Sequence, residues 1–259
     1  MQLQGKVAII TGGGKGIGRA IALAFAREGA KLVLAARDTE ALDRVAGEVA
    51  EARAEVLTIA TDVADEAQVG AMVAQAVERF GRVDILVNNS GIPGPTKPLW
   101  EMEPDEWDEV MNVNLRGPYL CARAVMVTML KQGAGRIINI SSILGRQPLA
   151  GRSPYVASKA GLVGLTQTLA HEAGPHGITV NLISPGATAG ERLDLVLTRL
   201  GAAQGMSLEQ IRAVVLRDTP LRRFVEADDV ARAAVFLASD AAANITGEDL
   251  NVTAGRGMW

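Results

Sequence analysis

The sequence predicts an α/β fold, a doubly wound parallel sheet of about seven strands with helices on both faces. Three observations carry this prediction. Short apolar runs alternate with segments of helical period, most of the runs are apolar on both sides, and a glycine-rich turn follows the first run. Strands buried on both faces belong to parallel sheets, and alternation with helices builds such sheets through right-handed crossovers.

The apolar runs are expected to form the strands. Each is four to eight residues long in the way that buried strands are, and glycines or polar residues bound most of them. The first is "KVAII" and the last is "EDLNVT". The expected strands span 6–10, 31–36, 55–60, 83–88, 136–141, 178–184 and 248–253.

The segments between these runs repeat their apolar residues with a helical period and are expected to form helices. Pro104 stands at the start of the longest one. The first turn of a helix tolerates proline because the missing N–H would have no partner there. The expected helices span 17–28, 39–52, 66–79, 105–131, 155–173 and 227–238.

Residues 187–226 interrupt the alternation, because they contain two amphipathic pieces and no strand. We expect these residues to form an inserted helical flap beside the carboxyl edge of the sheet, and we refer to them as the flap. No interior stretch has the composition of a linker. The whole chain, 1–259, is therefore expected to be a single domain.

Composition excludes several classes of function. Basic and acidic residues nearly balance, 26 against 29, so the chain lacks the excess of a general nucleic-acid binder. No apolar run of about 18 residues predicts a membrane span, and the start of the chain lacks a signal-peptide pattern. The one cysteine, Cys121, and the two histidines, His171 and His176, show no metal-ligand spacing. We expect a cytoplasmic protein without an internal disulfide or a metal site.

The turn "TGGGKGIG" after the first strand contains Gly12, Gly16 and Gly18. Glycines let the backbone turn tightly and approach a pyrophosphate, and the following helix points its first amides at the anion. An ordinary glycine-rich turn between a strand and a helix is the alternative, since such a pattern alone has a real false-positive rate.

The end of the second strand favours NADP(H) over NAD(H). Enzymes for the unphosphorylated dinucleotide usually place an acidic residue there, on the ribose 2′-hydroxyl. This chain has Ala36 followed by Arg37, and Lys15 adds a second cation from the glycine turn. Asp38 could be a ribose ligand or a helix N-cap, and we favour the cap.

Three motifs in order, "TGGGKGIG", "NNSG" (88–91) and "YVASK" (155–159), closely resemble those of the short-chain dehydrogenase/reductase family. The resemblance covers essentially the whole chain. It implies a Rossmann-like fold, a nicotinamide cofactor, and hydride transfer between an alcohol and a carbonyl. It also implies a homotetramer built from the helices at 105–131 and 155–173 and the C-terminal strand, where Trp259 would help to bury the terminus.

Carried over residue by residue, the resemblance implies a catalytic tetrad of Asn114, Ser142, Tyr155 and Lys159. Tyr155 and Lys159 are four apart and would share one face of a helix. An ammonium beside a phenol favours the phenolate, so Tyr155 would be the general acid and base. Ser142 would stabilise charge on the substrate oxygen, and Asn114 would position a water that relays protons to the lysine.

The resemblance also implies the residues that bind the cofactor. Family members often have threonine at the position of Gly190, so either Thr188 or backbone groups would bind the nicotinamide carboxamide. The predicted cofactor-binding set is Gly12, Lys15, Gly16, Ile17, Gly18, Arg37, Asp62, Val63, Asn88, Ser90, Gly91, Tyr155, Lys159, Pro185, Gly186 and Thr188.

The substrate is expected to be a small molecule, a neutral and moderately apolar ketone or alcohol, bound by residues from 92–100, 143–153 and the flap. Two alternatives stay open. One is a 3-oxoacyl-[acyl-carrier-protein] reductase, although Gly133 and His176 stand where such enzymes show arginines for the carrier. The other is a cofactor-binding regulator without catalysis, which usually has a broken tetrad.

Overall fold

A computed structural model describes residues 1–258, so the expectation for Trp259 lies outside the described residues. Seven strands form one sheet in the order β3-β2-β1-β4-β5-β6-β7, and every neighbouring pair is parallel. The predicted doubly wound sheet is confirmed. The strands are β1 (Val7–Thr11), β2 (Lys31–Ala36), β3 (Val56–Ala60), β4 (Ile85–Asn88), β5 (Gly135–Ile140), β6 (Ile178–Pro185) and β7 (Asp249–Val252).

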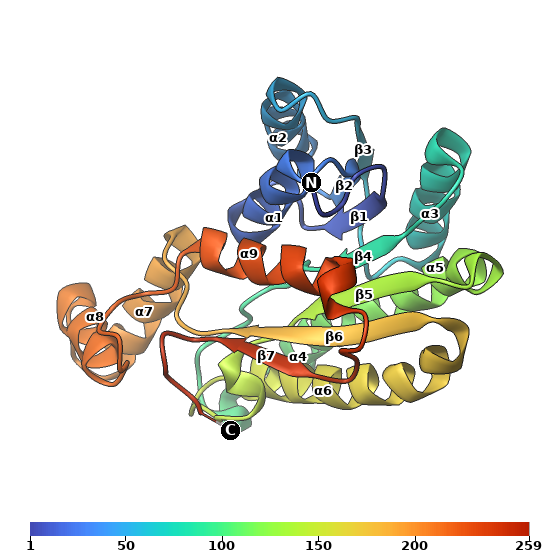
Figure 1. Cartoon of the computed structure of the whole chain (residues 1–259). Coiled ribbons are helices and arrows are strands. Elements are labelled where there is room, and N and C mark those ends of the chain that lie inside the picture. The colour runs from blue at the N-terminus through green and yellow to red at the C-terminus, as the bar shows by residue number, and fades with distance from the viewer. Residues whose placement is uncertain (259) are drawn as a thin grey trace.

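Helices cover both faces of the sheet (Figure 1). One apolar cluster joins the strands to α1 (Gly16–Arg27), α2 (Thr39–Glu51) and α9 (Ala227–Ala238). A second cluster, on the opposite face, joins them to α3 (Glu66–Phe80), α5 (Gly117–Gln132) and α6 (Ser153–Ala173). Because the strands are buried between two helical layers, the runs of Val, Ile and Leu that predicted them are apolar on both sides.

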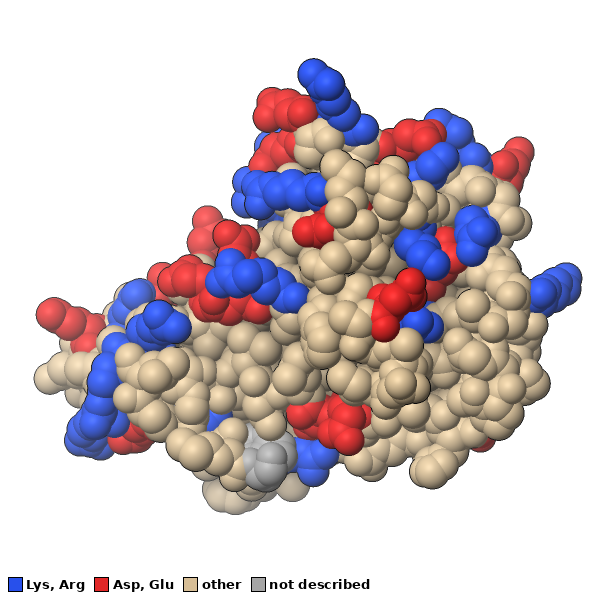
Figure 2. Space-filling model, viewed as in Figure 1, with Lys and Arg blue, Asp and Glu red and all other residues tan. Residues whose placement is uncertain are grey.

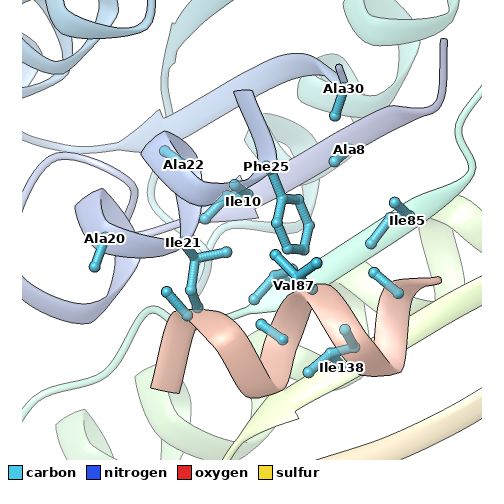
Figure 3. Close-up of a cluster of buried hydrophobic side chains, with 14 of the residues drawn as sticks. Ala8, Ile10, Ala20, Ile21, Ala22, Phe25, Ala30, Ile85, Val87 and Ile138 are labelled. Carbon is cyan, nitrogen blue, oxygen red and sulfur yellow. The ribbon is translucent and has the colours of Figure 1, made fainter. Parts of the chain in front are cut away.

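The first cluster includes the contact between α1 and α9 over the sheet (Figure 3). Phe25 points from α1 toward the strands and is fully buried. Burying one such side chain contributes roughly 2–3 kcal/mol. This packing fixes α1 against the sheet and therefore fixes the glycine turn that precedes it.

The single helix expected at 105–131 is three pieces. These are α4 (Pro104–Met111), a π-helical turn η2 (Asn112–Arg116) and α5. Pro118 has no N–H to donate to the carbonyl four residues earlier, which is that of Asn114. The regular ladder is therefore interrupted at Asn114, and a π-turn accommodates the change.

The flap contains two helices, α7 (Glu191–Ala203) and α8 (Leu208–Arg217), which pack on each other through a small apolar cluster of their own. An isolated bridge between Thr188 and Val225 joins its two ends. In Figure 1 the flap projects from one side of the sheet. Four 3₁₀ turns complete the fold: η1 (Leu99–Glu101), η3 (Ile143–Gly145), η4 (Gly174–His176) and η5 (Asp240–Ala242).

The strand order reverses between β1 and β4, because β2 and β3 follow β1 on one side and β4 to β7 continue on the other. Open α/β sheets bind their ligands at the carboxyl ends of the strands beside such a switch point. The three sequence motifs follow β1, follow β4 and open α6. Across residues 1–258, none of the helices has both the length and the apolar character needed to cross a membrane.

Candidate active site

The glycine turn after β1 is shaped for close approach of the backbone. Gly12 has φ +65°, and a Cβ at Gly18 would collide with the carbonyl oxygen of Gly12. Gly16 has φ +51° and open space where a side chain would be. Unlike α2 and α3, helix α1 has neither a side-chain N-cap nor an acidic residue in its first turn. Its first amides have no intrahelical partner, so the turn fits a dinucleotide phosphate.

At the end of β2, Asp38 is the N-cap of α2, as the sequence favoured. Its Oδ1 accepts a hydrogen bond from the N–H of Ala41, and its Oδ2 lies 2.6 Å from Lys15 Nζ. These two contacts, the lysine first, lower the pKa of the Asp38 carboxyl. Arg37 is largely exposed, and its Nη1 lies 3.9 Å from Asp62 Oδ2. Both cations predicted from the sequence therefore lie at this edge of the sheet.

The "NNSG" segment is attached to the glycine turn by two residues that the sequence analysis did not select. Thr11 Oγ1 accepts hydrogen bonds from the N–H groups of Asn89 and Ser90, each 3.0 Å long. Asn89 Nδ2 donates to the carbonyl oxygens of Thr11 and Gly12. Both residues belong to the quoted motifs, but the motifs do not show which of their residues form the hydrogen bonds that join the two segments.

Asn88 and Val63, both predicted to touch the cofactor, direct their side chains into the protein. Asn88 Nδ2 donates to Asn139 Oδ1 at 2.8 Å. Val63 is buried where α5 begins, against Gly117. Any cofactor contact at these two positions would come from the backbone. Ile17 is half-buried and packs on the core beneath the start of α1.

Tyr155 and Lys159 lie on the first turns of α6 and face each other. Lys159 Nζ is 5.8 Å from the centroid of the Tyr155 ring and donates to the carbonyl oxygen of Ile140 at 2.8 Å. The lysine is 4% exposed. Burial, with a smaller contribution from the charge of Arg192, lowers the pKa of Lys159 to about 7.

Asn114 is fully buried in the π-turn, where its side-chain amide forms hydrogen bonds with the backbone of Ile92. Oδ1 accepts from the Ile92 N–H at 2.8 Å, and Nδ2 donates to the Ile92 carbonyl at 3.0 Å and to Ser158 Oγ at 3.3 Å. A Cβ at Gly91 would lie 3.1 Å from Asn114 Oδ1 and 3.8 Å from Lys159 Nζ. Asn114, Gly91 and Lys159 therefore border one small space.

The two serines after β5 differ in what they do. Ser141 is buried and its Oγ donates to the carbonyl oxygen of Lys159 at 3.3 Å. Ser142, the predicted member of the tetrad, is half-buried and is the N-cap of η3, where its Oγ accepts from the Leu144 N–H at 3.2 Å. Its hydroxyl hydrogen remains available for another acceptor.

The segment after β6 approaches the C-terminal strand closely. Pro185 is the buried last residue of β6, and a Cβ at Gly186 would lie 3.0 Å from the Cα of Thr253. Thr188 Oγ1 donates to the Gly186 carbonyl at 3.3 Å, and the residue forms the bridge with Val225 that closes the flap. Thr188 therefore stands between the predicted nicotinamide site and the flap.

Arg152, which sequence reasoning missed, lies beside the tyrosine. It is 2% exposed, and its Cζ is 5.0 Å from the centroid of the Tyr155 ring. Nη2 donates to the carbonyl oxygen of Pro93 at 2.8 Å. An arginine in a polar stretch such as "AGRSPY" is usually exposed, so the sequence contains no signal of this burial.

Comparison with known proteins places the chain in one family. The family model described as short chain dehydrogenase matches residues 6–196. The chain is 40% identical over 255 residues to the short chain dehydrogenase/reductase astE of Aspergillus oryzae, covering 98% of this chain and 95% of the relative. It is 37% identical to the 3-oxoacyl-[acyl-carrier-protein] reductase FabG of Staphylococcus aureus, covering 98% of both.

Solved structures agree with the fold. An NAD⁺-bound xylitol dehydrogenase superposes with a TM-score of 0.96 at 30% identity, covering 98% of this chain and 100% of that one. A variant of actinorhodin polyketide ketoreductase with NADPH gives 0.95 at 35% identity, covering 100% and 99%. One of these proteins binds the unphosphorylated dinucleotide and the other the phosphorylated one.

Proposed function

Because the chain belongs to the short-chain dehydrogenase family, we propose that it is an NADP(H)-dependent oxidoreductase that interconverts a carbonyl and a secondary alcohol, with Tyr155 as the general acid and base. Membership itself makes the chain an oxidoreductase of CH–OH or carbonyl groups that uses a nicotinamide cofactor. The proposal adds the phosphorylated cofactor and the roles of the residues. Its main support is the buried Lys159 amine 5.8 Å from the Tyr155 ring, at the sheet edge that carries the glycine turn.

The residues of this site divide the work of moving a proton. When bound, the nicotinamide supplies or accepts the hydride. In reduction Tyr155 gives its phenolic proton to the carbonyl oxygen, and in oxidation the phenolate takes the hydroxyl proton. A charged Lys159 stabilises that phenolate. Ser142 has its lone pair engaged by Leu144 and donates its hydrogen to the substrate oxygen as charge builds.

Asn114 has a positioning role in this proposal. Its amide fixes the Ile92 backbone, and Oδ1 borders the space between Gly91 and Lys159. A water in that space would have Asn114 and Lys159 as polar neighbours, which is what a proton relay to the lysine requires.

Preference for NADP(H) is supported by the contacts of Asp38. One carboxylate oxygen accepts from the Ala41 N–H and the other pairs with Lys15. A ribose 2′-hydroxyl would have to compete with both partners. Lys15 and Arg37 would instead bind a 2′-phosphate. The Arg37 side chain is exposed, and its nearest carboxylate, that of Asp62, is 3.9 Å away.

The test begins with fluorescence titrations of NADPH and NADH, followed by kinetics on a panel of ketones and alcohols with the tighter cofactor. We expect NADPH to bind at least about tenfold more tightly, a difference of roughly 1.4 kcal/mol. Tyr155→Phe should bind the cofactor normally and lose turnover by about 100-fold or more, since general acid–base catalysis contributes that much. Tyr119→Phe, at the other tyrosine of the chain, is the matched control.

Unchanged turnover in Tyr155→Phe would reject Tyr155 as the acid and base. Tighter binding of NADH would reject the cofactor assignment. A parent protein that binds the cofactor and turns over no carbonyl or alcohol would favour a non-catalytic regulator.

A second candidate, 3-oxoacyl-[acyl-carrier-protein] reductase, is favoured by the 37% identity to the FabG protein. Arg136, the arginine nearest the expected carrier-docking face, is mostly buried and lies 3.5 Å from Asp240. It is therefore poorly placed to bind an acidic carrier. Faster reduction of a 3-oxoacyl group on the carrier protein than on free pantetheine would establish this candidate.

The remaining parts of the proposal are a single domain over 1–259, a homotetramer, a cytoplasmic location, and a small-molecule substrate. Neither nucleic acid nor a membrane has a part in it.

A further inference from the structure

Three arginines near the tyrosine have no salt bridge to any of residues 1–258. They are Arg152, in the turn before α6, and Arg192 and Arg199, on α7. Two other flap arginines differ, because Arg212 pairs with Asp194 and Arg217 pairs with Asp218. Arg222 and Arg223, at the far end of the flap, also have no salt bridge among the described residues, but Arg192 and Arg199 are the ones whose charges act on Arg152 beside Tyr155.

Arg152 is the most constrained of the three. Its guanidinium is buried against the Tyr155 ring, and its Nε has no hydrogen-bond partner in the part of the chain that the structure describes. Burial lowers the pKa of Arg152, and the like charges of Arg192 and Arg199 lower it further, while Tyr155 opposes them. A buried charge with an unsatisfied donor is costly unless an anion compensates it.

Arg192 and Arg199 are seven residues apart, which places them on one face of α7. Arg199 Nη1 lies 3.5 Å from the carbonyl oxygen of Gly94, next to the Pro93 carbonyl that Arg152 binds. Arg192 is near enough to Lys159 for its charge to contribute to the lowered pKa of that lysine. Both side chains are exposed, so a ligand can reach them.

We propose that the substrate carries an oxyanion, a carboxylate or a phosphate, and that Arg152, Arg192 and Arg199 bind this group while the carbonyl faces Tyr155. The inference rests on the proposed oxidoreductase function and names its class of substrate. Guanidinium groups suit this role because their forked N–H groups match the geometry of carboxylates and phosphates. It replaces the neutral substrate expected from the apolar residues of the flap.

The cofactor is a less suitable partner for these charges. Its phosphates are expected at the glycine turn before α1 and at Lys15 and Arg37, whereas Arg152 and Arg199 bind the carbonyls of Pro93 and Gly94 after β4. Three like charges near one another repel, and the two with side-chain partners, Arg152 and Arg199, bind only carbonyl oxygens of residues 1–258. An anionic substrate would remove that repulsion each time it binds.

The test compares anionic carbonyls with neutral ones of the same skeleton. The probes are acetoacetate and 4-oxopentanoate, each against its methyl ester, and hydroxyacetone phosphate against hydroxyacetone. We expect kcat/KM to favour an anion over its neutral partner by about 10- to 100-fold, the usual effect of a hydrogen bond to a charged group. The carboxylate and phosphate arms identify which oxyanion is bound.

Arginine variants assign the preference to these side chains. Arg192→Gln and Arg199→Gln should each reduce the preference for the anion severalfold or more, mainly through KM, while the affinity for NADPH stays unchanged. Arg217→Gln, which removes one exposed charge from the same flap, should keep the preference. Arg152→Gln belongs in the set only if its melting curve matches the parent, and the two α7 variants decide the matter without it.

Equal kcat/KM for anions and their neutral partners would overturn the inference while leaving the proposed function intact. Loss of NADPH affinity with an unchanged preference in Arg192→Gln and Arg199→Gln would also overturn it, by assigning the arginines to the cofactor. A protein that turns over no carbonyl or alcohol would remove the proposed function and this inference together.

Discussion

The ring of Tyr155 is close to two basic side chains, one from its own helix and one from the turn before it. Lys159 follows four residues later at 5.8 Å from the ring centroid, and Arg152 precedes by three residues at 5.0 Å. Cations over an aromatic face are attracted to it by roughly 0.5–2 kcal/mol. The two residues therefore fix the orientation of the ring before any ligand arrives.

Lys159 should make stability depend on pH. Its pKa is about 7 in the fold, because burial penalises the ammonium, and near 10.4 in an unfolded chain. Between these values the unfolded chain binds a proton that the folded chain has released, so the free energy of unfolding rises with pH. Below pH 7 the full penalty applies.

We therefore expect Lys159→Met to be more stable than the parent at pH 6, by about 2 kcal/mol or more, with the advantage shrinking as the pH rises to 9. Urea unfolding at pH 6, 7.5 and 9 measures this difference. Lys131→Met, which removes an exposed lysine from α5, is the control and should show no comparable trend. A constant difference between Lys159→Met and the parent at all three pH values would contradict the prediction.

Single residues also mark the limit of sequence reasoning at this site. Tyr155 and Lys159 are predicted from the short motif "YVASK", whose resemblance to the family and helical spacing are both local properties of the sequence. Arg152 was missed because its burial depends on the Pro93 carbonyl, 59 positions earlier in the chain. For Asn88 the predicted cofactor contact stays a prediction, but the sequence does not show that its side chain binds Asn139 on the neighbouring strand, a contact that depends on the register of β4 and β5.

At the level of elements, the glycines of the two N-terminal helices have opposite roles. Gly18 lies where a Cβ would strike the Gly12 carbonyl, so its absence of a side chain is required by packing. Gly47 lies on the exposed side of α2 with nothing within 4 Å of an added Cβ. Glycine in a helix interior lowers stability by roughly 0.5–1 kcal/mol relative to alanine, and at Gly47 no close packing requires it.

Gly47→Ala should therefore raise the melting temperature by about 2–4 °C and leave cofactor binding unchanged. Gly18→Ala should weaken cofactor binding by at least about tenfold, since the turn must open to admit the methyl group. Melting curves and fluorescence titrations of the two variants, each the control of the other, measure both effects. Parental cofactor affinity in Gly18→Ala would show that the turn does not bind the dinucleotide.

The elements themselves followed from periodicity, with one instructive exception. Strands and helices are predicted within a few residues of their observed ends, because burial on one or both faces requires apolar residues at a regular spacing. The π-turn at Asn112–Arg116 changes the spacing of apolar residues very little, so the sequence pattern does not predict it. Pro118 was a visible cause, but only the structure shows that it displaces the ladder at the residue whose side chain holds Ile92.

For the whole molecule, topology was predictable and assembly was not. Alternating strands and helices leave few ways to arrange a sheet, and right-handed crossovers select the observed order. Exposed apolar residues on the surface are a weaker indication of where subunits would meet. Tyr119, Val127 and Leu130 on α5 are 46%, 61% and 43% exposed. In Figure 2 the lower right of the molecule, over β6 and α6, shows few charged side chains.

Tyr119 lines a groove of about 440 Å³ between the π-turn η2 and α6, whose other lining residues include Met111, Leu115 and Leu165, and Val127 and Leu130 lie further along α5. A second copy of the chain would cover such a surface, as the proposed homotetramer requires. We expect light scattering after gel filtration to give about four times the chain mass of 27.2 kDa. Val127→Asp should shift the protein to dimers or monomers, because a carboxylate buried without a partner costs several kcal/mol.

Met206→Asp, which places the same charge on the tip of the flap, is the control for Val127→Asp and should leave the mass unchanged. The parental mass in Val127→Asp would show that subunits meet elsewhere, and a monomeric parent would remove the tetramer altogether.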